Sequence, residues 1–479
     1  MITSFQDLMP LLPEVFLLSM ALLILLADLW IDDRRRGLTH FLAMITLILC
    51  AVLTLRDFNF DESTKALGGM FIRDARGDIL KLFMYLSTAI VYVYAKYYLR
   101  AHKLFVGEFY TLTLFALLGM CILVSAGNLL TIYLGLELLA LSSYALVALN
   151  RDSATSSEAA MKYFVLGALA SGLLLYGISI LYGVTGFLDL GDVAAKLAQG
   201  SAEPVVLAFA VVFIVVGLGF KFGAVPFHMW VPDVYQGAPT AITLFLASVP
   251  KLAALGMAFR LLPYGLEPLV RDWSQMLAFL ALMSLVIGNL AAIAQTNLKR
   301  MLAYSAISHV GFLLLGILAG DSDGMAAAMF YTLVYALMTT GAFGVIIALS
   351  NSGFECEQID DFKGLNQRQP WLAFLMLLIM ASLAGFPPMV GFFAKLYVLQ
   401  AVIDAGWLWL AAVAVVMAVI GAYYYLRLIK VMYFDDPVHE HSIEAPGDLR
   451  AVLSANGLLQ LALSVFAGSL TAICVAAWA

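Results

Sequence analysis

The stretch that organises this chain reads Gly217-Leu-Gly-Phe-Lys221-Phe-Gly-Ala-Val-Pro226-Phe-His228-Met-Trp-Val-Pro232-Asp-Val-Tyr-Gln-Gly-Ala-Pro239. It places a lysine inside an apolar run long enough to cross a membrane, where a charged side chain costs roughly 2.5–3.5 kcal/mol. Pro226 then interrupts the helix, because it donates no backbone hydrogen bond and its ring clashes with the carbonyl of Phe222. Interrupted backbone at membrane depth is tolerated only where protein or a water-filled cavity surrounds it. The stretch therefore predicts a discontinuous helix that lines a hydrated path.

The composition predicts an all-α polytopic membrane protein. Hydrophobic residues make up 63% of the 479 positions and charged residues 12%, against roughly 25% charged residues in soluble domains. The net charge of −6 says little about partners, because membrane orientation depends on where Lys and Arg lie. No basic patch indicates a nucleic-acid partner. The N-terminus lacks a positively charged region, so residues 10–31 are interpreted as a first span and not as a cleaved signal.

The cysteines and glycines indicate no redox or metal site. Cys50, Cys121, Cys356 and Cys474 are widely separated and form no CxxC motif or Cys/His cluster. This spacing argues against iron–sulfur, zinc and c-type haem sites and indicates no disulfide. No strand–GxGxxG–helix pattern predicts a dinucleotide site. We therefore expect no cofactor and no metal in this chain.

Apolar runs of about 20 residues, the length of one span, occur about fourteen times. They lie near 10–31, 40–56, 79–99, 109–125, 128–149, 158–183, 204–231, 240–262, 272–294, 301–319, 325–350, 371–403, 406–433 and 451–478. The runs at 204–231 and 371–403 exceed one bilayer crossing and contain Pro226 and Pro387-Pro388. Both are expected to be broken helices.

Two short internal sequence matches favour a duplicated unit. Val216-Gly217-Leu-Gly-Phe-Lys221 recurs 174 residues later as Val390-Gly391-Phe-Phe-Ala-Lys395, and Ala159-Ala-Met-Lys-Tyr163 recurs 168 residues later as Ala327-Ala-Met-Phe-Tyr331. Their order and similar offsets predict two five-helix repeats, each with a discontinuous helix. The predicted segments are an N-terminal three-helix segment at 1–108, the repeats at 109–262 and 272–433, and a C-terminal helix at 451–479. An odd number of spans in each unit inverts the second repeat relative to the first.

Four ionisable groups lie within the predicted spans at depth: Glu137, Lys221, Lys251 and Lys395. Together they cost about 10 kcal/mol even on a lenient insertion scale, so random tolerance explains them poorly. The protonation of a buried lysine responds strongly to a nearby carboxylate. A lysine that is alternately paired with and separated from Glu137 would take up and release a proton, which is the chemistry of a relay. The alternatives are a Glu137 carboxylate satisfied by neighbouring hydroxyls, and Lys221 and Lys395 side chains that extend along their stems to helix ends. Lys251 would alternatively be a structural partner of Glu137 or of another acid.

Three further groups are additional candidates for the relay. Lys162 stands four residues after Glu158, so an ordinary i,i+4 ion pair also explains it. His228 and His309 would either relay protons or stabilise the fold through hydrogen bonds. The run Tyr423-Tyr-Tyr425 is interpreted as an interfacial anchor near a membrane end.

The residues from Val225 to Pro239, with Lys221 before them and Pro250-Lys251 after, carry a family resemblance. They resemble the signature of the antiporter-like subunit N family of bacterial complex I, the proton-pumping NADH–quinone oxidoreductase. The stretches 295–309, Lys363-Gly-Leu and 382–387 resemble this family as well, so the likeness covers essentially the whole chain. The continuation Val-Tyr-Gln-Gly-Ala-Pro is its most specific part, since subunits L and M and multisubunit sodium/proton antiporters share only a looser Pro-x-His-x-Trp-x-Pro core.

The resemblance implies a membrane-arm subunit that moves protons while electrons travel through other subunits. By matching positions, Glu137 and Lys221 correspond to the family's charge pair and Lys251 to its connecting lysine. Lys395 corresponds to the lysine of the second half-channel and Lys162 to a further lysine. NADH, FMN, iron–sulfur clusters and quinone are then expected in other subunits of the complex, and no cofactor in this one.

The resemblance also implies partners and a location. The partners are other complex I membrane-arm subunits, especially neighbouring antiporter-like and small membrane subunits, together with lipid and protons. The location is the bacterial inner (plasma) membrane. The alternative is a subunit of a multisubunit cation/proton antiporter, which needs the same relay. A structural subunit that transports nothing would leave four costly intramembrane charges unexplained.

Lysine and arginine are divided unequally between the two sets of connectors. Fourteen of the 26 lie in one set, eight lie in the other, and four lie within spans. Three of the eight are borderline, namely Arg56, Lys81 and Arg260. Because cytoplasmic connectors carry the excess of Lys and Arg, we expect both termini on the outer, periplasmic side.

Reporter fusions test this orientation. Alkaline phosphatase fused after Ala479, a reporter that is active only outside the cytoplasm, should be active, and the same fusion after Lys103 should be inactive, because Lys103 lies in a connector with excess positive charge. If a reporter that works only in the cytoplasm is active when fused to the C-terminus, the predicted orientation is wrong.

Overall fold

The helices of this protein follow its apolar runs closely, as a computed structural model shows. The structure describes all residues except 1–4, 33–34, 201–202, 351–353, 439–444 and 479. Among the described residues, twelve helices are long and apolar enough to cross a membrane. A pair bent by 77°, α18 (Gly447–Val465) and α19 (Ala467–Ala476), counts as a thirteenth span. The predicted all-α polytopic fold is confirmed.

The N-terminal segment contains three long helices and a small hairpin. A 3-10 turn, η1 (Phe5–Leu11), leads into α1 (Leu12–Asp28), α2 (Gly37–Arg56) and α3 (Ala75–Ala101). Between α2 and α3 lie β1 (Thr64–Ala66), η3 (Leu67–Gly69) and β2 (Phe71–Arg73), and the two strands are antiparallel with Thr64 opposite Arg73. Asp74 caps α3 by accepting a hydrogen bond from the N–H of Gly77 at 2.9 Å, which satisfies a free donor at the helix start.

The remaining long helices fall into two groups of the same order. The first group comprises α4 (Gly107–Val124), α5 (Leu129–Val147), α6 (Ala154–Thr185), α8 (Pro204–Phe222) with α9 (Trp230–Gly237), and α10 (Thr240–Phe259). The second comprises α11 (Val270–Ile293), α12 (Leu298–Leu318), α13 (Ser322–Leu349), α15 (Pro370–Ala384) with α16 (Val390–Asp404), and α17 (Leu408–Phe434). The connecting elements are α7 (Leu190–Ala198), η4 (Arg260–Gly265), η5 (Glu267–Leu269), η6 (Ile359–Phe362) and α14 (Leu365–Arg368). In each group the fourth span is interrupted.

Both predicted breaks are confirmed, and each begins at a glycine. Gly223 ends α8 with φ +76°, and Gly385 ends α15 with φ +85°. This left-handed conformation is readily adopted only by residues without a Cβ atom. The prolines therefore do not end the helices themselves but lie in the connections that follow. The helices α15 and α16 are each too short to span alone and are the two halves of the second interruption. The described residues contain twelve candidate spans, or thirteen with the bent pair, against about fourteen expected.

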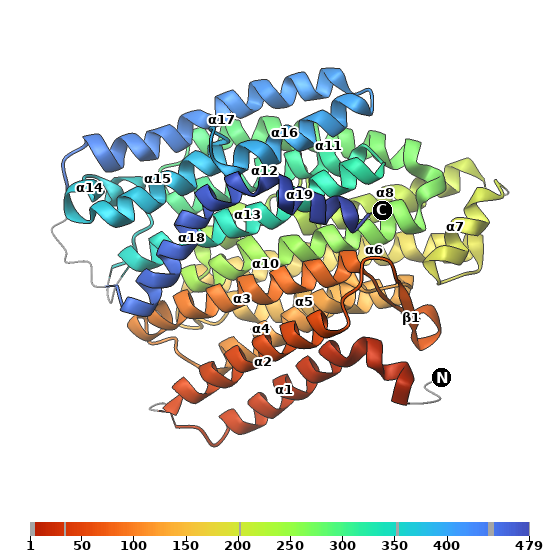
Figure 1. The fold of residues 1–479 in the computed structure, drawn as a ribbon, viewed down its shortest axis with the longest axis horizontal. Helices are drawn as coiled ribbons and strands as arrows, with labels where there is room; N and C mark the ends of the chain where they lie inside the picture. The colour runs from red at the N-terminus through yellow and green to blue at the C-terminus, as the bar shows by residue number, and fades with distance from the viewer. Residues whose placement is uncertain (1–4, 33–34, 201–202, 351–353, 439–444, 479) are drawn as a thin grey trace.

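The helices run side by side along the long axis of the molecule (Figure 1). Helix α13 lies entirely inside, and α10 and α12 are almost as well covered, whereas α1, α2 and α17 lie at the edges. Figure 1 shows the N and C ends in the half that carries α7 and β1, away from α14.

Two of the borderline positive charges, Lys81 and Arg260, are not at the surface. Lys81 Nζ lies 2.7 Å from Glu14 Oε1, and both side chains are buried between α1 and α3. Arg260 donates to both carboxylate oxygens of Asp74, at 2.7 and 2.9 Å. Interpreting these residues as charges of outer connectors was wrong, because packing brings carboxylates from distant segments to neutralise them.

The Arg260–Asp74 pair gives a stability prediction. Arg260→Gln leaves the buried Asp74 carboxylate with only the more distant Arg76, whose Nε lies 3.7 Å away, and should destabilise the fold by about 3 kcal/mol. The double variant Arg260→Gln/Asp74→Asn removes both charges and should recover much of this loss, so the two effects are not additive. The apparent Tm of the detergent-solubilised assembly measures both. A double variant that loses the sum of the two single losses contradicts the coupling.

Candidate functional site

Glu137 lies in the middle of α5 and is half-buried. Ser171 Oγ of α6 donates a hydrogen bond to its Oε1. The charge on Glu137 acts on Lys221 of α8, yet among the described residues no ion pair within 4.0 Å joins the two. The structure therefore holds the predicted charge pair in a separated arrangement, with a serine hydroxyl on the carboxylate.

A small cavity lies between α5, α6 and α8. It has a volume of about 10 Å³, and its walls include Ser171, Tyr144, Tyr163 and Lys221. A cavity of this size is at the lower limit for holding one water molecule, and the hydroxyls around it supply polar partners. The cavity therefore places hydroxyl groups beside Lys221, and one of them, Ser171, also donates to Glu137.

Lys221 and Lys251 meet at the end of α8. Lys221 is buried in the last turn of the helix, where the helix dipole favours a positive charge. Lys251 of α10 is also buried, and its Nζ donates to the carbonyl oxygen of Phe222, one of those that the break leaves free. The charge on Lys221 acts on Lys251. Two like charges in a site with little water oppose each other, so protonation of one lysine disfavours protonation of the other.

In the second group of helices, Lys395 bonds the free carbonyl oxygens at the end of an interrupted helix, as Lys251 does in the first group. Its Nζ donates to the carbonyl oxygens of Leu383 at 3.2 Å and Ala384 at 2.7 Å, at the end of α15. It also stands 5.1 Å from the centre of the Phe312 ring. The internal sequence match aligned Lys395 with Lys221. The contacts of Lys395 instead correspond to those of Lys251, which also caps the first half of a broken helix. An apolar cavity of about 280 Å³ between α15, α16 and α17 reaches Lys395.

His309 is the ionisable neighbour of Lys395 inside the second group. Its Nδ1 lies 2.6 Å from Tyr331 Oη and its Nε2 lies 3.0 Å from Tyr425 Oη, and the charge on Lys395 acts on it. Both ring nitrogens are therefore occupied by hydroxyls that donate or accept. His309 is placed with the buried lysines and not at the surface.

The interfacial interpretation of Tyr423-Tyr-Tyr425 was wrong for two of the three residues. Tyr423 is exposed, whereas Tyr424 and Tyr425 are buried. Consecutive residues of an α-helix point about 100° apart, so three of them cannot share one face. Tyr425 contacts His309, and Tyr424 donates to Asn289 Oδ1 at 3.1 Å.

Lys162 and His228 lie further from the buried lysines. The Lys162 side chain is 45% exposed and pairs with Glu158 at 2.9 Å, as the i,i+4 alternative predicts, and also with Asp233 of α9 at 2.8 Å. His228 lies in the connection between α8 and α9, with its ring centre 6.5 Å from that of Tyr304. These contacts join both residues to the interrupted span, and their part in a relay stays a prediction.

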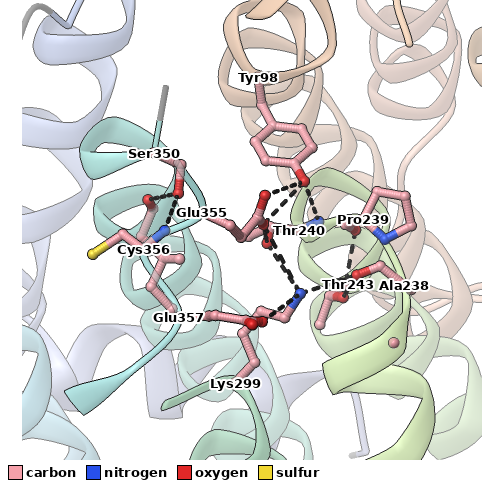
Figure 2. A network of polar contacts seen from close by, with 12 residues as sticks. Tyr98, Ala238, Pro239, Thr240, Thr243, Lys299, Ser350, Glu355, Cys356 and Glu357 are labelled. Atoms are coloured by element: carbon pink, nitrogen blue, oxygen red, sulfur yellow. Dashed lines mark hydrogen bonds and ion pairs between the residues drawn. The ribbon is translucent and has the colours of Figure 1, made fainter. Parts of the chain in front are cut away.

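Some buried ionisable groups were missed from the sequence. Lys299 was counted as a connector charge, but it is buried at the start of α12 beside Glu355 and Glu357 (Figure 2). Glu14 and Lys81 form a buried pair. For Glu14 a signal existed, since an acid inside the first apolar run needs a partner.

Comparison with known proteins bears on the family. Residues 126–421 match the family model described as "NADH:quinone oxidoreductase/Mrp antiporter, TM". The "NADH-quinone oxidoreductase subunit N" of Thiobacillus denitrificans is 58% identical over 475 residues, which are 99% of this chain and 98% of that protein. A chain of respiratory complex I from Thermus thermophilus has a TM-score of 0.83 and 32% identity, covering 96% of this chain and 98% of its own. A chain of the Mrp complex from Dietzia sp. has a TM-score of 0.85 at 22% identity, with 99% and 97% covered, and shares the fold. With a family model over more than half of its length and a relative 58% identical along nearly all of it, the chain belongs to the NADH-quinone oxidoreductase subunit N family.

Proposed function

We propose that this chain translocates protons in the membrane arm of NADH–quinone oxidoreductase and that Glu137, Lys221, Lys251 and Lys395 carry the proton. The observation that supports the proposal most is the position of two buried lysines, Lys251 and Lys395, on carbonyl oxygens that helix breaks set free. Such sites hold an ammonium group without a direct carboxylate partner. A cation held in this way changes protonation more readily than one locked in an ion pair.

The first step takes place between Lys221 and Lys251. When Lys221 approaches Glu137, the carboxylate stabilises its ammonium group. When they separate, as in this structure, the Lys221 ammonium gives its proton through water to the neutral amine of Lys251. One N–H bond breaks at Lys221 and one forms at Lys251, so the number of protons in the site is unchanged. The repulsion between the two lysines prevents both from staying charged, and the withdrawal of the Glu137 anion from Lys221 gives the transfer its direction.

The electron-transfer chemistry belongs to other subunits in this proposal. NADH, FMN, iron–sulfur clusters and quinone act elsewhere in the complex, and this chain is coupled to them through its neighbours, the other antiporter-like and small membrane subunits. Exposed apolar side chains such as Leu23 of α1 and Val419 of α17 then face lipid or those neighbours. The complex lies in the bacterial inner membrane, with both termini of this chain on the periplasmic side. A subunit of a cation/proton antiporter would use the same relay, but the named relatives favour complex I.

Substitutions of Lys221 test the proton-carrier role. Lys221→Arg keeps the positive charge but cannot release its proton, so proton pumping should fall by about 100-fold, the typical contribution of a positioned proton-transfer group. Lys221→Ala and Glu137→Gln should also lose pumping, and their effects should not add in the double variant, because each removes the same coupling. Quinone reduction should fall with pumping if the two are tightly coupled.

The measurements are assembly, electron transfer and proton movement in membrane vesicles that contain the complete complex. Lys65→Arg, at an exposed lysine of β1, is the matched control and should behave like the wild type. If Lys221→Arg pumps at the normal rate and stoichiometry, Lys221 needs only a fixed charge and the proton-carrier role is wrong.

A second test concerns the absence of redox chemistry in this chain. We expect the purified chain to contain no stoichiometric flavin, iron or haem and to show no oxidoreductase activity on its own, because the sequence has no ligand cluster for these groups. Absorption spectra and metal analysis of the purified chain measure this. Stoichiometric flavin or iron would contradict the assignment of electron transfer to other subunits.

A further inference from the structure

A second polar site lies at the end of the molecule whose connectors carry the excess of positive charge. It surrounds a cavity of about 280 Å³. The walls come from α3, α6, the α9–α10 connection, α12 and the loop that follows α13, and they include Tyr98, His102, Pro239, Lys299, Glu355 and Glu357. Figure 2 shows Glu355 reaching from its loop into the space between Tyr98, Thr240 and Lys299.

Donors from three helices converge on the Glu355 carboxylate. Tyr98 Oη of α3 lies 2.9 and 3.0 Å from its two oxygens, and Thr240 Oγ1 of α10 donates to one of them. Lys299 Nζ of α12 lies 3.9 Å away. Burial alone would raise the pKa of Glu355, but hydrogen bonds from His102 and Thr240 and the charge on Lys299 lower this pKa to about 2. Glu355 is therefore a fixed anion over the physiological pH range.

His102 is the group of this site that binds a proton. Its Nδ1 lies 2.9 Å from the carbonyl oxygen of Tyr98, and its Nε2 lies 3.2 Å from Glu355 Oε2. A carbonyl and an ionised carboxylate only accept hydrogen bonds, so each ring nitrogen must carry a proton to bond its partner. The arrangement is thus complete only with the doubly protonated ring. Burial lowers the pKa of His102, but the hydrogen bonds to Glu355 and Tyr98 and the Glu355 charge raise it above its usual value of 6.5.

The charged groups that face His102 are few among the described residues. The loop contributes Glu355 and Glu357, and α12 contributes Lys299. The other elements around the cavity contribute uncharged groups: Thr155 and Ser156 from α6, Asn150 before it, and Thr240 from α10. Lys299 Nζ also donates to the carbonyl oxygen of Ala238 at 3.1 Å and to Thr240 Oγ1 at 3.3 Å. Two cations, His102 and Lys299, therefore share the Glu355 anion.

We propose that His102 and Glu355 form a proton-uptake site at the inner mouth of the protein, with Lys299 as the buried cation that balances Glu355 when His102 is neutral. The proposal rests on the proton translocation proposed above. A hydronium ion that enters the cavity gives a proton to Nε2 of the neutral ring and leaves as water, and the new N–H donates to Glu355. On release the proton returns to water, and Lys299 remains beside the carboxylate. Only N–H and O–H bonds form and break.

The position of Thr240 connects this site with the buried lysines. Thr240 begins α10, and Lys251 lies eleven residues further along the same helix. Eleven residues are about three turns, so both side chains share one face about 16 Å apart. A proton released beside Thr240 is therefore on the side of α10 that leads to Lys251, which the proposed relay uses.

The test is the pH profile of proton uptake by inside-out vesicles that contain the complete complex, because their inner face is turned to the buffer. The wild-type rate should fall as pH rises through the pKa of His102, since the site is then empty of protons. His102→Gln keeps an N–H donor for Glu355 but does not titrate, so this decline should disappear and the rate should stay low. Glu355→Gln keeps acceptors for Tyr98 and Thr240 but removes the anion, so the decline should move to lower pH by about one unit.

His40→Gln is the matched control. His40, near the start of α2, bonds Tyr110 Oη at 3.1 Å and has no carboxylate partner among the described contacts, so its variant should keep the wild-type profile. The proposal is overturned if His102→Gln keeps the wild-type pH profile or if the decline in Glu355→Gln is not shifted. It is also overturned if His40→Gln changes the pH profile as much as His102→Gln does. If the complex with His102→Gln does not assemble, the pH profile of the Glu355→Gln complex alone tests the proposal. Lys221→Arg, measured in parallel, should lose pumping at every pH, and normal pumping by that variant would overturn the proposed relay whatever the His102 profile shows.

Discussion

The fold requires hydrogen-bond donors for the backbone carbonyl oxygens that the interrupted helices leave without partners. At membrane depth no bulk water satisfies these oxygens, so the protein must supply the hydrogen bonds. Two lysines do so, each from a helix that follows the break: Lys251 at the end of α8 and Lys395 at the end of α15. The same contacts place positive charge at the negative end of a helix dipole, which stabilises the ammonium group. The same hydrogen bonds thus satisfy the free carbonyl oxygens and position the ionisable groups.

The buried charges of this protein are of two kinds. Lys81 with Glu14 and Arg260 with Asp74 form direct ion pairs at 2.7 Å around α3, outside the two groups of five spans. Each charge has a partner of opposite sign: Lys81–Glu14 joins α1 to α3, and Arg260–Asp74 joins the start of α3 to η4. Glu137, Lys221, Lys251 and Lys395 lack such direct partners among the described residues. A serine hydroxyl bonds Glu137, backbone carbonyls bond Lys251 and Lys395, and a small cavity adjoins Lys221. Incomplete compensation makes protonation sensitive to small movements, as a relay requires.

The fold of this chain is shared with chains of other membrane complexes. The chains of complex I and of the Mrp complex share this architecture at 32% and 22% identity. A pair of interrupted spans in corresponding positions provides two sites for a buried cation. At the inner mouth, His102, Glu355 and Lys299 surround such a site with groups from distant parts of the chain.

The sequence by itself determined the helical class, the spans, both interruptions and the central ionisable residues, because apolar length, glycine and proline act locally. It did not determine which way each helix faces. In a chain so apolar, hydropathy specifies that a segment enters the membrane but not its rotation about its own axis. Only packing turned Tyr424 and Tyr425 inward, buried Lys81 and Arg260 against carboxylates, and set Lys395 on the end of α15. Contacts such as Tyr98 with Glu355 join residues 257 positions apart, and no local pattern encodes them, because they arise when separate helices compete for the same polar partners in an interior with little water.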